Sequence, residues 1–93
     1  MRYQEKLRQE LPRLRAKFHV RTLGVFGSHV RGTATGESDL DLLVEFSHTP
    51  GLLEFIHCEQ YLSDRLGVKV DLVMKETLKP RIGQRILREV VGL

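Results

Sequence analysis

The chain has 93 residues, of which 41% are hydrophobic and 29% are charged, with one cysteine and a formal net charge of +3 at pH 7. This balance predicts one soluble globular domain over residues 1–93 and argues against a disordered chain or a second module. The single Cys58 excludes an internal disulfide, the start of the chain is polar, and no apolar run is long enough to span a membrane, so we expect a cytoplasmic protein.

The charges are unevenly distributed along the chain. Residues 1–18 carry six basic and two acidic side chains, residues 19–74 carry four basic and eight acidic ones, and residues 75–93 carry five basic and two acidic ones. An acidic middle is typical of a metal site, whereas the basic ends suit either an acidic partner or RNA, or are simply solvated helix faces. Because no aromatic residues are interleaved with the basic ones, we do not expect direct binding of nucleic acid.

The first half of the chain predicts a helix, a strand and a helical turn. Helical spacing is carried by Tyr3, Leu7, Leu11, Leu14 and Phe18. Pro12 falls inside this pattern and should kink the helix or divide it near Leu11. A strand is expected over 20–26, followed by a helical turn over 28–31 and a polar loop over 33–38.

The second half of the chain predicts two strands and two helices in alternation. A nearly continuous apolar strand over 40–46 suggests burial on both faces. A helix over 52–66, a strand over 68–73 and a helix from Pro80 to about Val91 follow. This order predicts an α/β (α+β) domain, with a small mixed three-stranded sheet and helices packed mainly on one face.

Three carboxylates stand where strands are expected. Asp39 and Asp41 are two residues apart, so on a strand their side chains share one face, and Asp71 interrupts a later apolar run. An aspartate surrounded by apolar residues needs a partner or a metal. If the two strands are neighbours, the three like charges meet at one edge and require a hard cation, with Mg²⁺ the natural choice.

A possible phosphate site precedes these carboxylates. Gly27 and Ser28, on a tight strand-to-helix turn, offer backbone N–H groups and a hydroxyl to a phosphate. The planar, delocalised guanidinium of Arg31 suits phosphate, although a structural pair with a carboxylate such as Glu37 is the alternative.

Taken singly, each of these signals has an ordinary explanation. The Asp-x-Asp pair can be a solvated strand start, and Asp71 can keep an edge strand soluble. Their conjunction favours a metal site beside a phosphate cradle, which is the equipment for phosphoryl-type transfer.

On these motifs the chain resembles the nucleotidyltransferase superfamily typified by DNA polymerase β, and within it the minimal nucleotidyltransferases of bacteria and archaea. Ser28 is followed by ten residues before Asp39, then come Leu40 and Asp41, and Asp71 fills the place of the third carboxylate. The resemblance covers essentially the whole chain. It implies a polymerase β-like nucleotidyltransferase fold and a single minimal nucleotidyltransferase domain over residues 1–93.

The resemblance also implies roles for individual residues. Asp39 and Asp41 would hold two Mg²⁺ ions, while Asp71 would serve the second metal and activate the acceptor hydroxyl. The residues implied in binding the nucleotide, ATP, are Gly27, Ser28, Arg31 and Ser38.

Minimal proteins of this family are typically encoded beside a helical toxin ribonuclease of the HEPN type and act as its antitoxin, and some transfer AMP to a tyrosine of the toxin. The resemblance therefore implies a Mg-dependent protein adenylyltransferase that releases pyrophosphate and forms a hetero-oligomer with the toxin. Two other interpretations stay open: a binding module that neutralises the toxin by occlusion, and an enzyme that modifies a small molecule or a tRNA end. The nucleotide preference, the modified residue, the number of AMP units and the oligomeric state are not decided by the sequence.

Overall fold

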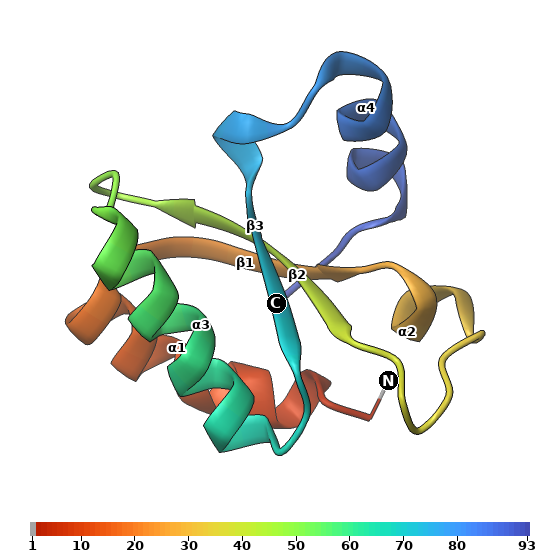
Figure 1. Cartoon of the computed structure of the whole chain (residues 1–93), viewed down its shortest axis with the longest axis horizontal. Coiled ribbons are helices and arrows are strands. Elements are labelled where there is room, and N and C mark those ends of the chain that lie inside the picture. Colours follow the sequence, from red (N-terminus) through yellow and green to blue (C-terminus); the bar gives the residue numbers. More distant parts are fainter. Residues whose placement is uncertain (1) are drawn as a thin grey trace.

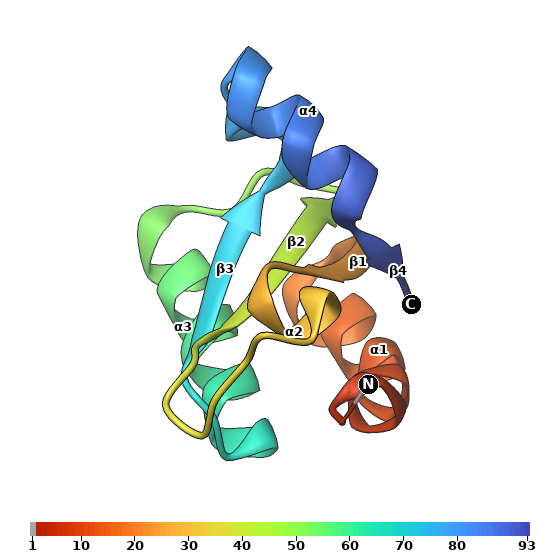
Figure 2. The same cartoon turned by 90° about the vertical axis from the view of Figure 1, so that its right-hand side faces the viewer.

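The sheet of this protein is mixed, with the longest strands at its centre. The computed structural model describes residues 2–93, so Met1, the first residue of the predicted domain, lies outside the described part. Within that part the strand order is β3-β2-β1-β4 (Figures 1 and 2). The strands are β1 (Val20–Phe26), β2 (Leu40–Phe46), β3 (Val70–Met74) and β4 (Val91–Gly92). β1 pairs antiparallel with both β2 and β4, and β2 pairs parallel with β3.

The helices divide between the two faces of the sheet. They are α1 (Gln4–Phe18), α2 (Ser28–Arg31), α3 (Leu52–Leu66) and α4 (Pro80–Glu89), with a 3₁₀ turn, η1 (Lys75–Thr77), after β3. α1 and α3 lie together against one face, whereas α4 stands on the opposite side (Figures 1 and 2). This arrangement confirms the predicted α/β class, with helices mainly on one face. In the described part of the chain, no helix has the length and apolar character needed to cross a membrane.

The core lies between the sheet and the pair α1 and α3. Leu40, Leu42 and Val44 of β2 belong to the buried cluster, so the alternate residues of this strand face the other side. Leu43, on that other side, is also buried, but Asp41 is only half-buried. The expected burial of β2 on both faces therefore holds for its middle and fails at its start, because Asp41 faces the more open side.

The predicted three-stranded sheet is wrong by one strand. Val91 and Gly92 pair with β1 as β4, directly after α4 ends at Glu89. A two-residue strand has no visible alternation, and Gly92 is a poor strand residue, so the sequence pattern continued the helix to Val91. The third strand also begins at Val70 rather than at residue 68.

Of the two effects expected of Pro12, a kink or a division of the first helix, the division does not occur. α1 runs from Gln4 to Phe18 as one element. Leu11 and Leu14, on either side of the proline, are both buried in the core, so packing fixes the turns before and after it. Burial of this kind offsets the loss of one backbone hydrogen bond.

The outer edge of β3 is closed by side chains of α3. The Leu72 N–H donates to Oε2 of Glu59 over 2.9 Å, and the Val70 N–H donates to the Ser63 hydroxyl over 3.0 Å. Edge strands usually leave such donors unpaired. Glu59 is half-buried in this role.

A buried carboxylate joins α1 to α3. Glu10 is 4% exposed and accepts hydrogen bonds from the Tyr61 hydroxyl at 2.7 Å and from Nε of Arg65 at 2.9 Å. Burial by itself would raise the pKa of Glu10, but the hydrogen bonds from Tyr61 and Arg65 outweigh it and leave the pKa lowered. The charged form is therefore stabilised by folding.

We expect Glu10→Ala to lower the free energy of unfolding by about 2 kcal/mol, because two hydrogen bonds to a charged group are lost. Urea denaturation at pH 7 measures this, with Glu5→Ala on the exposed first turn of α1 as the control. A lowered folded-state pKa means that the contribution is present at neutral pH and disappears as the pH falls through that value. If the wild type and Glu10→Ala differed in free energy of unfolding by the same amount at low pH as at pH 7, this role of the Glu10 carboxylate would be contradicted.

Candidate active site

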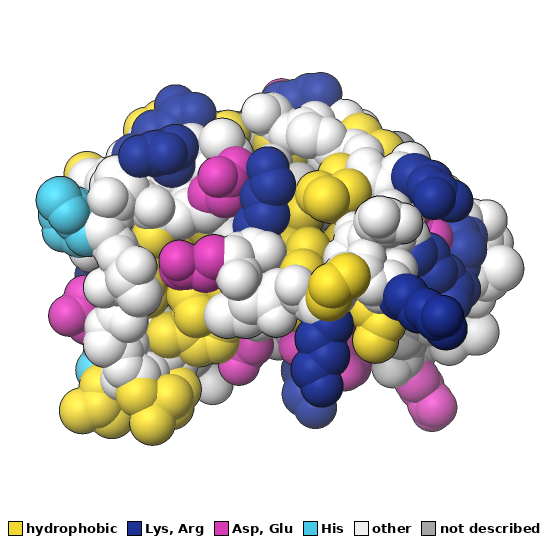
Figure 3. Space-filling view, turned by 90° about the horizontal axis from the view of Figure 1, so that it is seen from above, with side chains coloured by type: hydrophobic (Ala, Val, Ile, Leu, Met, Phe, Trp, Pro, Cys, Tyr) yellow, Lys and Arg dark blue, Asp and Glu magenta, His cyan; other side chains and the backbone are white. Residues whose placement is uncertain are grey.

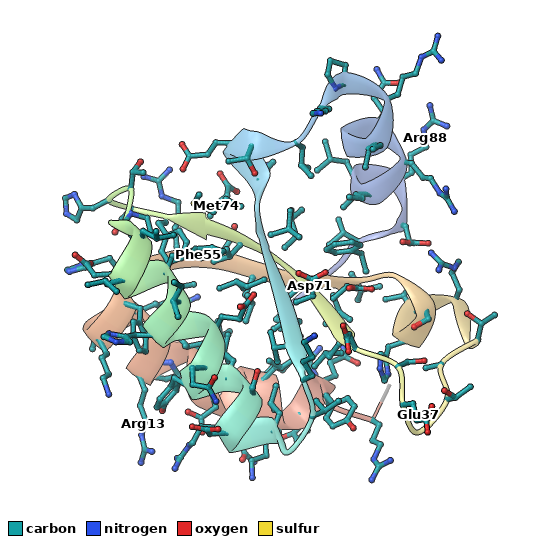
Figure 4. All side chains as sticks on the ribbon, viewed as in Figure 1. Arg13, Glu37, Phe55, Asp71, Met74 and Arg88 are labelled. Atoms are coloured by element: carbon teal, nitrogen blue, oxygen red, sulfur yellow. The ribbon has the colours of Figure 1, made fainter. Side chains whose placement is uncertain are left out.

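The register of the sheet brings two of the three predicted carboxylates side by side. β2 and β3 are parallel neighbours, and Asp41 is the register partner of Asp71. Directly paired residues of adjacent strands project to the same face, so both carboxylates lie on the α4 side of the sheet. Asp39 stands just before β2, two residues from Asp41. Figure 4 shows Asp71 over the middle of the sheet, far from the loop that carries Glu37.

The electrostatic environment couples these carboxylates. The pKa of Asp41 is raised first by its partial burial and then by the negative charges of Asp71 and Asp39, while His29 and Arg31 oppose the rise. Like charges close to a half-buried carboxylate are unfavourable unless a proton or a cation is present. The site is therefore prepared to attract positive charge.

Asp41→Asn should make the protein more stable at neutral pH in the presence of EDTA, because it removes a half-buried charge that its neighbours repel. The raised folded-state pKa means that ionised Asp41 costs stability above that value, and that the cost disappears as the pH falls and the group takes up a proton. Thermal melts at several pH values measure the gap between variant and wild type. A variant that melts below the wild type at pH 7 would contradict the coupling.

The three carboxylates do not converge into a closed metal site. Oδ2 of Asp39 lies 3.9 Å from Nζ of Lys69. Among residues 2–93 no three His, Cys, Asp or Glu side chains are close enough to hold one ion. The oxygen-only donor set and the repulsion at Asp41 nevertheless fit a hard divalent cation.

One argument from the sequence is wrong. Asp71 was expected to need a partner because apolar residues flank it, but its side chain is exposed on the open face of β3. Val70 and Leu72 on either side point into the core instead. The alternation of the strand separates the carboxylate from its apolar neighbours, so burial does not require it to bind a metal.

The turn at Gly27 packs directly against Asp41. Gly27 has φ 81° and ψ −155°, a conformation that is almost exclusive to glycine. An added Cβ there would collide with a carboxylate oxygen of Asp41. Glycine is therefore required twice, for its backbone angles and for the close approach, and α2 starts at Ser28 immediately after it.

Arg31 is paired with a carboxylate that the sequence did not single out. Its Nη1 lies 2.7 Å from Oε1 of Glu89, at the end of α4, and the expected alternative partner Glu37 is not the one used. The other carboxylate oxygen, Oε2, accepts the Gly27 N–H over 2.8 Å. Residue spacing gives no signal for this contact, because Glu89 is 58 residues from Arg31.

Ser38 shapes the loop before the carboxylates. Its hydroxyl accepts the Thr35 N–H over 2.9 Å, and its own N–H donates to the Thr35 carbonyl over 3.1 Å. These contacts fix the approach to Asp39. The structure gives Ser38 a part in building the loop, and direct contact with a nucleotide stays a prediction.

The carboxylate face is a surface rather than a deep cavity. Figure 3, seen from the α4 side, shows apolar side chains between patches of Asp or Glu and of Lys or Arg. A groove of 140 Å³ runs beneath α4 and is lined by Leu43, Leu87 and Val90 among others. A larger pocket of 470 Å³ lies at the other end of β2, around Arg21 and Lys75, and contains none of the predicted site residues. We locate the site by its carboxylates, because chemistry rather than volume distinguishes it.

Cys58 has no part in this site. It is fully buried in the core, and burial raises the pKa of its thiol to about 12. A thiol with such a pKa is not a nucleophile at neutral pH.

Comparisons with known proteins agree with the geometry. Residues 5–92 match the family model described as a nucleotidyltransferase domain. The protein adenylyltransferase MntA of Thermococcus cleftensis is 56% identical over 78 residues, which cover 84% of this chain and 79% of the relative. A solved structure described as a minimal nucleotidyltransferase superposes with a TM-score of 0.81 at 38% identity, covering 96% of this chain and 91% of the other.

A more distant structure shares the fold. It is described as the tri-AMPylated HEPN toxin of Shewanella oneidensis in complex with an MNT antitoxin, and a chain of it superposes with a TM-score of 0.70 at 19% identity. The match covers 96% of this chain and 70% of that one. The region that matches the family model contains every predicted site residue, from Gly27 to Asp71.

Proposed function

Because this chain belongs to the nucleotidyltransferase domain family and is a nucleotidyltransferase, we propose that it transfers AMP from ATP to a tyrosine hydroxyl of a HEPN-type toxin ribonuclease and so acts as an antitoxin. A relative at 56% identity is named a protein adenylyltransferase. The fold is shared with a chain of a complex between an AMPylated HEPN toxin and its antitoxin. The observation that carries the proposal is the pairing of Asp41 with Asp71 beside the Gly27 turn.

The proposed reaction assigns a task to each carboxylate. Asp39, Asp41 and Asp71 would hold two Mg²⁺ ions, which, when bound, offset the charge of the triphosphate and lower the pKa of the attacking hydroxyl. The tyrosine oxygen forms a bond to the α-phosphorus, the bond to the β-phosphate oxygen breaks, and pyrophosphate leaves. Asp71, the exposed carboxylate, takes the proton of the hydroxyl.

The nucleotide-binding side of the proposal uses the turn and the arginine. The Gly27 N–H that the sequence assigned to a phosphate donates to Glu89 instead. The N–H and hydroxyl of Ser28 would therefore face the triphosphate, with Gly27 supplying the turn and Arg31 orienting the phosphates. Arg31 uses Nη1 for Glu89, and a guanidinium carries five N–H donors, so other donors of the same fork are available to a phosphate. Ser38 would act through the loop that leads into Asp39.

The shape of the site favours a protein as the acceptor. Asp71 is exposed on an open face of β3, and the groove of 140 Å³ under α4 is lined by none of the three carboxylates. Pockets that enclose a small substrate are usually about 300–1,000 Å³. An open face lets a tyrosine on a folded partner reach the carboxylates.

Two observations support the alternative, a non-catalytic antitoxin that occludes the toxin. The carboxylates of the described residues do not form a ready metal site, and Glu89 occupies the Gly27 N–H and one end of Arg31. A binding module could act with the carboxylates apart and with Glu89 bonded to Gly27 and Arg31. Catalysis requires that the carboxylates draw together around cations.

The deciding experiment combines labelling with neutralisation. A purified HEPN-type toxin is incubated with this protein, Mg²⁺ and ATP labelled at the α-phosphate, and residual ribonuclease activity is measured in parallel. The proposal expects label on a toxin tyrosine and loss of ribonuclease activity only when ATP is present. Neutralisation without ATP and without label would favour occlusion.

A further inference from the structure

We propose that Glu89, the last residue of α4, is a positioning residue of the active site, which holds the Gly27 turn against Asp41 and fixes the direction of Arg31. The contacts of Glu89 with Gly27 and Arg31 do not depend on the proposed function, whereas a role for them in catalysis rests on it. Nothing in the sequence pattern connects Glu89 with the Gly-Ser turn. The contact exists only because the end of α4 returns to the β1 side of the sheet.

The Glu89 carboxylate spans two groups of the site. Oε2 accepts the Gly27 N–H at 2.8 Å, and Oε1 accepts from Nη1 of Arg31 at 2.7 Å. The side chain of Glu89 is 16% exposed, whereas that of Arg31 is 45% exposed. The hydrogen bond from Arg31, followed by the one from Gly27, lowers the pKa of Glu89, so the carboxylate is charged at neutral pH.

The Gly27 turn transmits this contact to Asp41. The Gly27 N–H is held by Glu89, its carbonyl accepts the N–H groups of Val30 and Arg31, and its Cα packs against the Asp41 carboxylate. A displacement of the turn would therefore change the space that Asp41 occupies. Glu89 acts on the carboxylate site through this backbone.

The backbone around Glu89 is itself firmly anchored. Val91, two residues later, pairs with Val25 of β1, and the Leu93 N–H donates to the Leu23 carbonyl over 3.0 Å. A Cβ at Gly24 would contact the Val90 side chain and the Val91 carbonyl, so β1 and the end of α4 approach closely there. A short strand that follows the glutamate thus fixes where its carboxylate lies.

The test uses Glu89→Gln and Glu89→Asp in the full chain. A glutamine can accept the Gly27 N–H or face Arg31 with its oxygen, but its NH₂ group then opposes a donor. We expect Glu89→Gln to lower kcat for AMP transfer about tenfold, which corresponds to about 1.4 kcal/mol, with a smaller change in KM for ATP. Glu89→Asp keeps the charge and should recover part of kcat.

The matched control is Glu10→Gln. Glu10 is also a carboxylate bonded to an arginine, but it lies on the other face of the sheet, between α1 and α3. This change should lower the melting temperature and leave kcat at the wild-type value once the protein is folded. If Glu89 only stabilised the fold, its variants would also lower the melting temperature and leave kcat at the wild-type value.

An independent readout is the amide proton of Gly27 in a ¹H–¹⁵N NMR spectrum. A hydrogen bond to a carboxylate shifts such a proton downfield, so its resonance should move upfield in Glu89→Gln while the peaks of α1 and α3 stay in place. Wild-type kcat with an unmoved Gly27 resonance would overturn the proposal, and so would faster transfer with tighter ATP binding, which would make the contact inhibitory. If the wild type transfers no label, the proposed function fails, and the Gly27 resonance then decides the positioning by itself.

Discussion

Asp41→Asn is expected to reduce AMP transfer to the toxin by about 10³-fold, equivalent to about 4 kcal/mol of transition-state stabilisation. Asp41 is the carboxylate that contacts or is coupled to each of the other parts of the site. It is paired in register with Asp71, coupled to Asp39, and packed on the Gly27 turn. Asparagine keeps the shape of the side chain and removes the negative charge that a cation requires.

Transfer of labelled AMP, measured in a single turnover with and without Mg²⁺, checks this result. The control is Asp64→Asn on α3, where an exposed carboxylate accepts a hydrogen bond from Gln60 on the helix-covered side of the sheet. That variant should transfer AMP at the wild-type rate. Equal transfer by Asp41→Asn and wild type would show that the assigned site is wrong.

The opposite effects of this substitution on stability and activity strengthen the test. The variant should melt higher than the wild type in EDTA, since a repelled charge has been removed. Added Mg²⁺ should raise the melting temperature of the wild type and have little effect on the variant. Loss of activity in a protein that has become more stable cannot be attributed to unfolding.

Gly27→Ala is expected to reduce AMP transfer by about 10²-fold or more, which corresponds to about 3 kcal/mol. The new methyl group would collide with the Asp41 carboxylate, and alanine cannot adopt the backbone angles of Gly27 without strain. Either the turn or the carboxylate must move. Both are parts of the proposed site, so transfer falls even where the fold survives.

Gly32→Ala separates the collision from the strain. Gly32 also has a positive φ, 78°, but a Cβ there would meet nothing within 4 Å. We expect it to destabilise the protein by about 1–2 kcal/mol and to leave kcat unchanged. Transfer rates at a temperature well below both melting points provide the measurement. An equal loss of kcat in the two variants would mean that the approach of Gly27 to Asp41 is irrelevant to the reaction.

The parts of the fold that the sequence predicted are those that depend on local periodicity. The helix indicated by the apolar spacing from Tyr3 to Phe18 and the strand over 20–26 are visible in the order of residues, and the structure confirms both. β4 was missed because two residues carry no period. Division of the first helix at Pro12, one of the two effects expected there, does not occur because buried leucines on both sides outweigh the local preference.

For the candidate site, too, the sequence predicted what depends on local alternation and missed the contacts between distant residues. The expectation that Asp41 and Asp71 share a face rested on alternation along strands and on the assumption that the strands are neighbours, and the register confirms it. Whether these residues hold metal or nucleotide stays a prediction. The partner of Arg31 could not be found from residue spacing, because Glu89 lies 58 residues away in the sequence. Contacts of that kind depend on the assembled fold.

The closure of the β3 edge by α3 has a consequence for how this protein associates with itself. Glu59 and Ser63 already take the outward N–H groups of Leu72 and Val70, so a second molecule cannot extend the sheet there by strand addition. The opposite margin is only the two residues of β4. Ordered fibrils built by edge-to-edge stacking of native sheets are therefore disfavoured at both edges of the sheet. Glu59→Ala leaves the Leu72 N–H without its acceptor, so this variant should aggregate at a lower protein concentration than the wild type, as measured by turbidity.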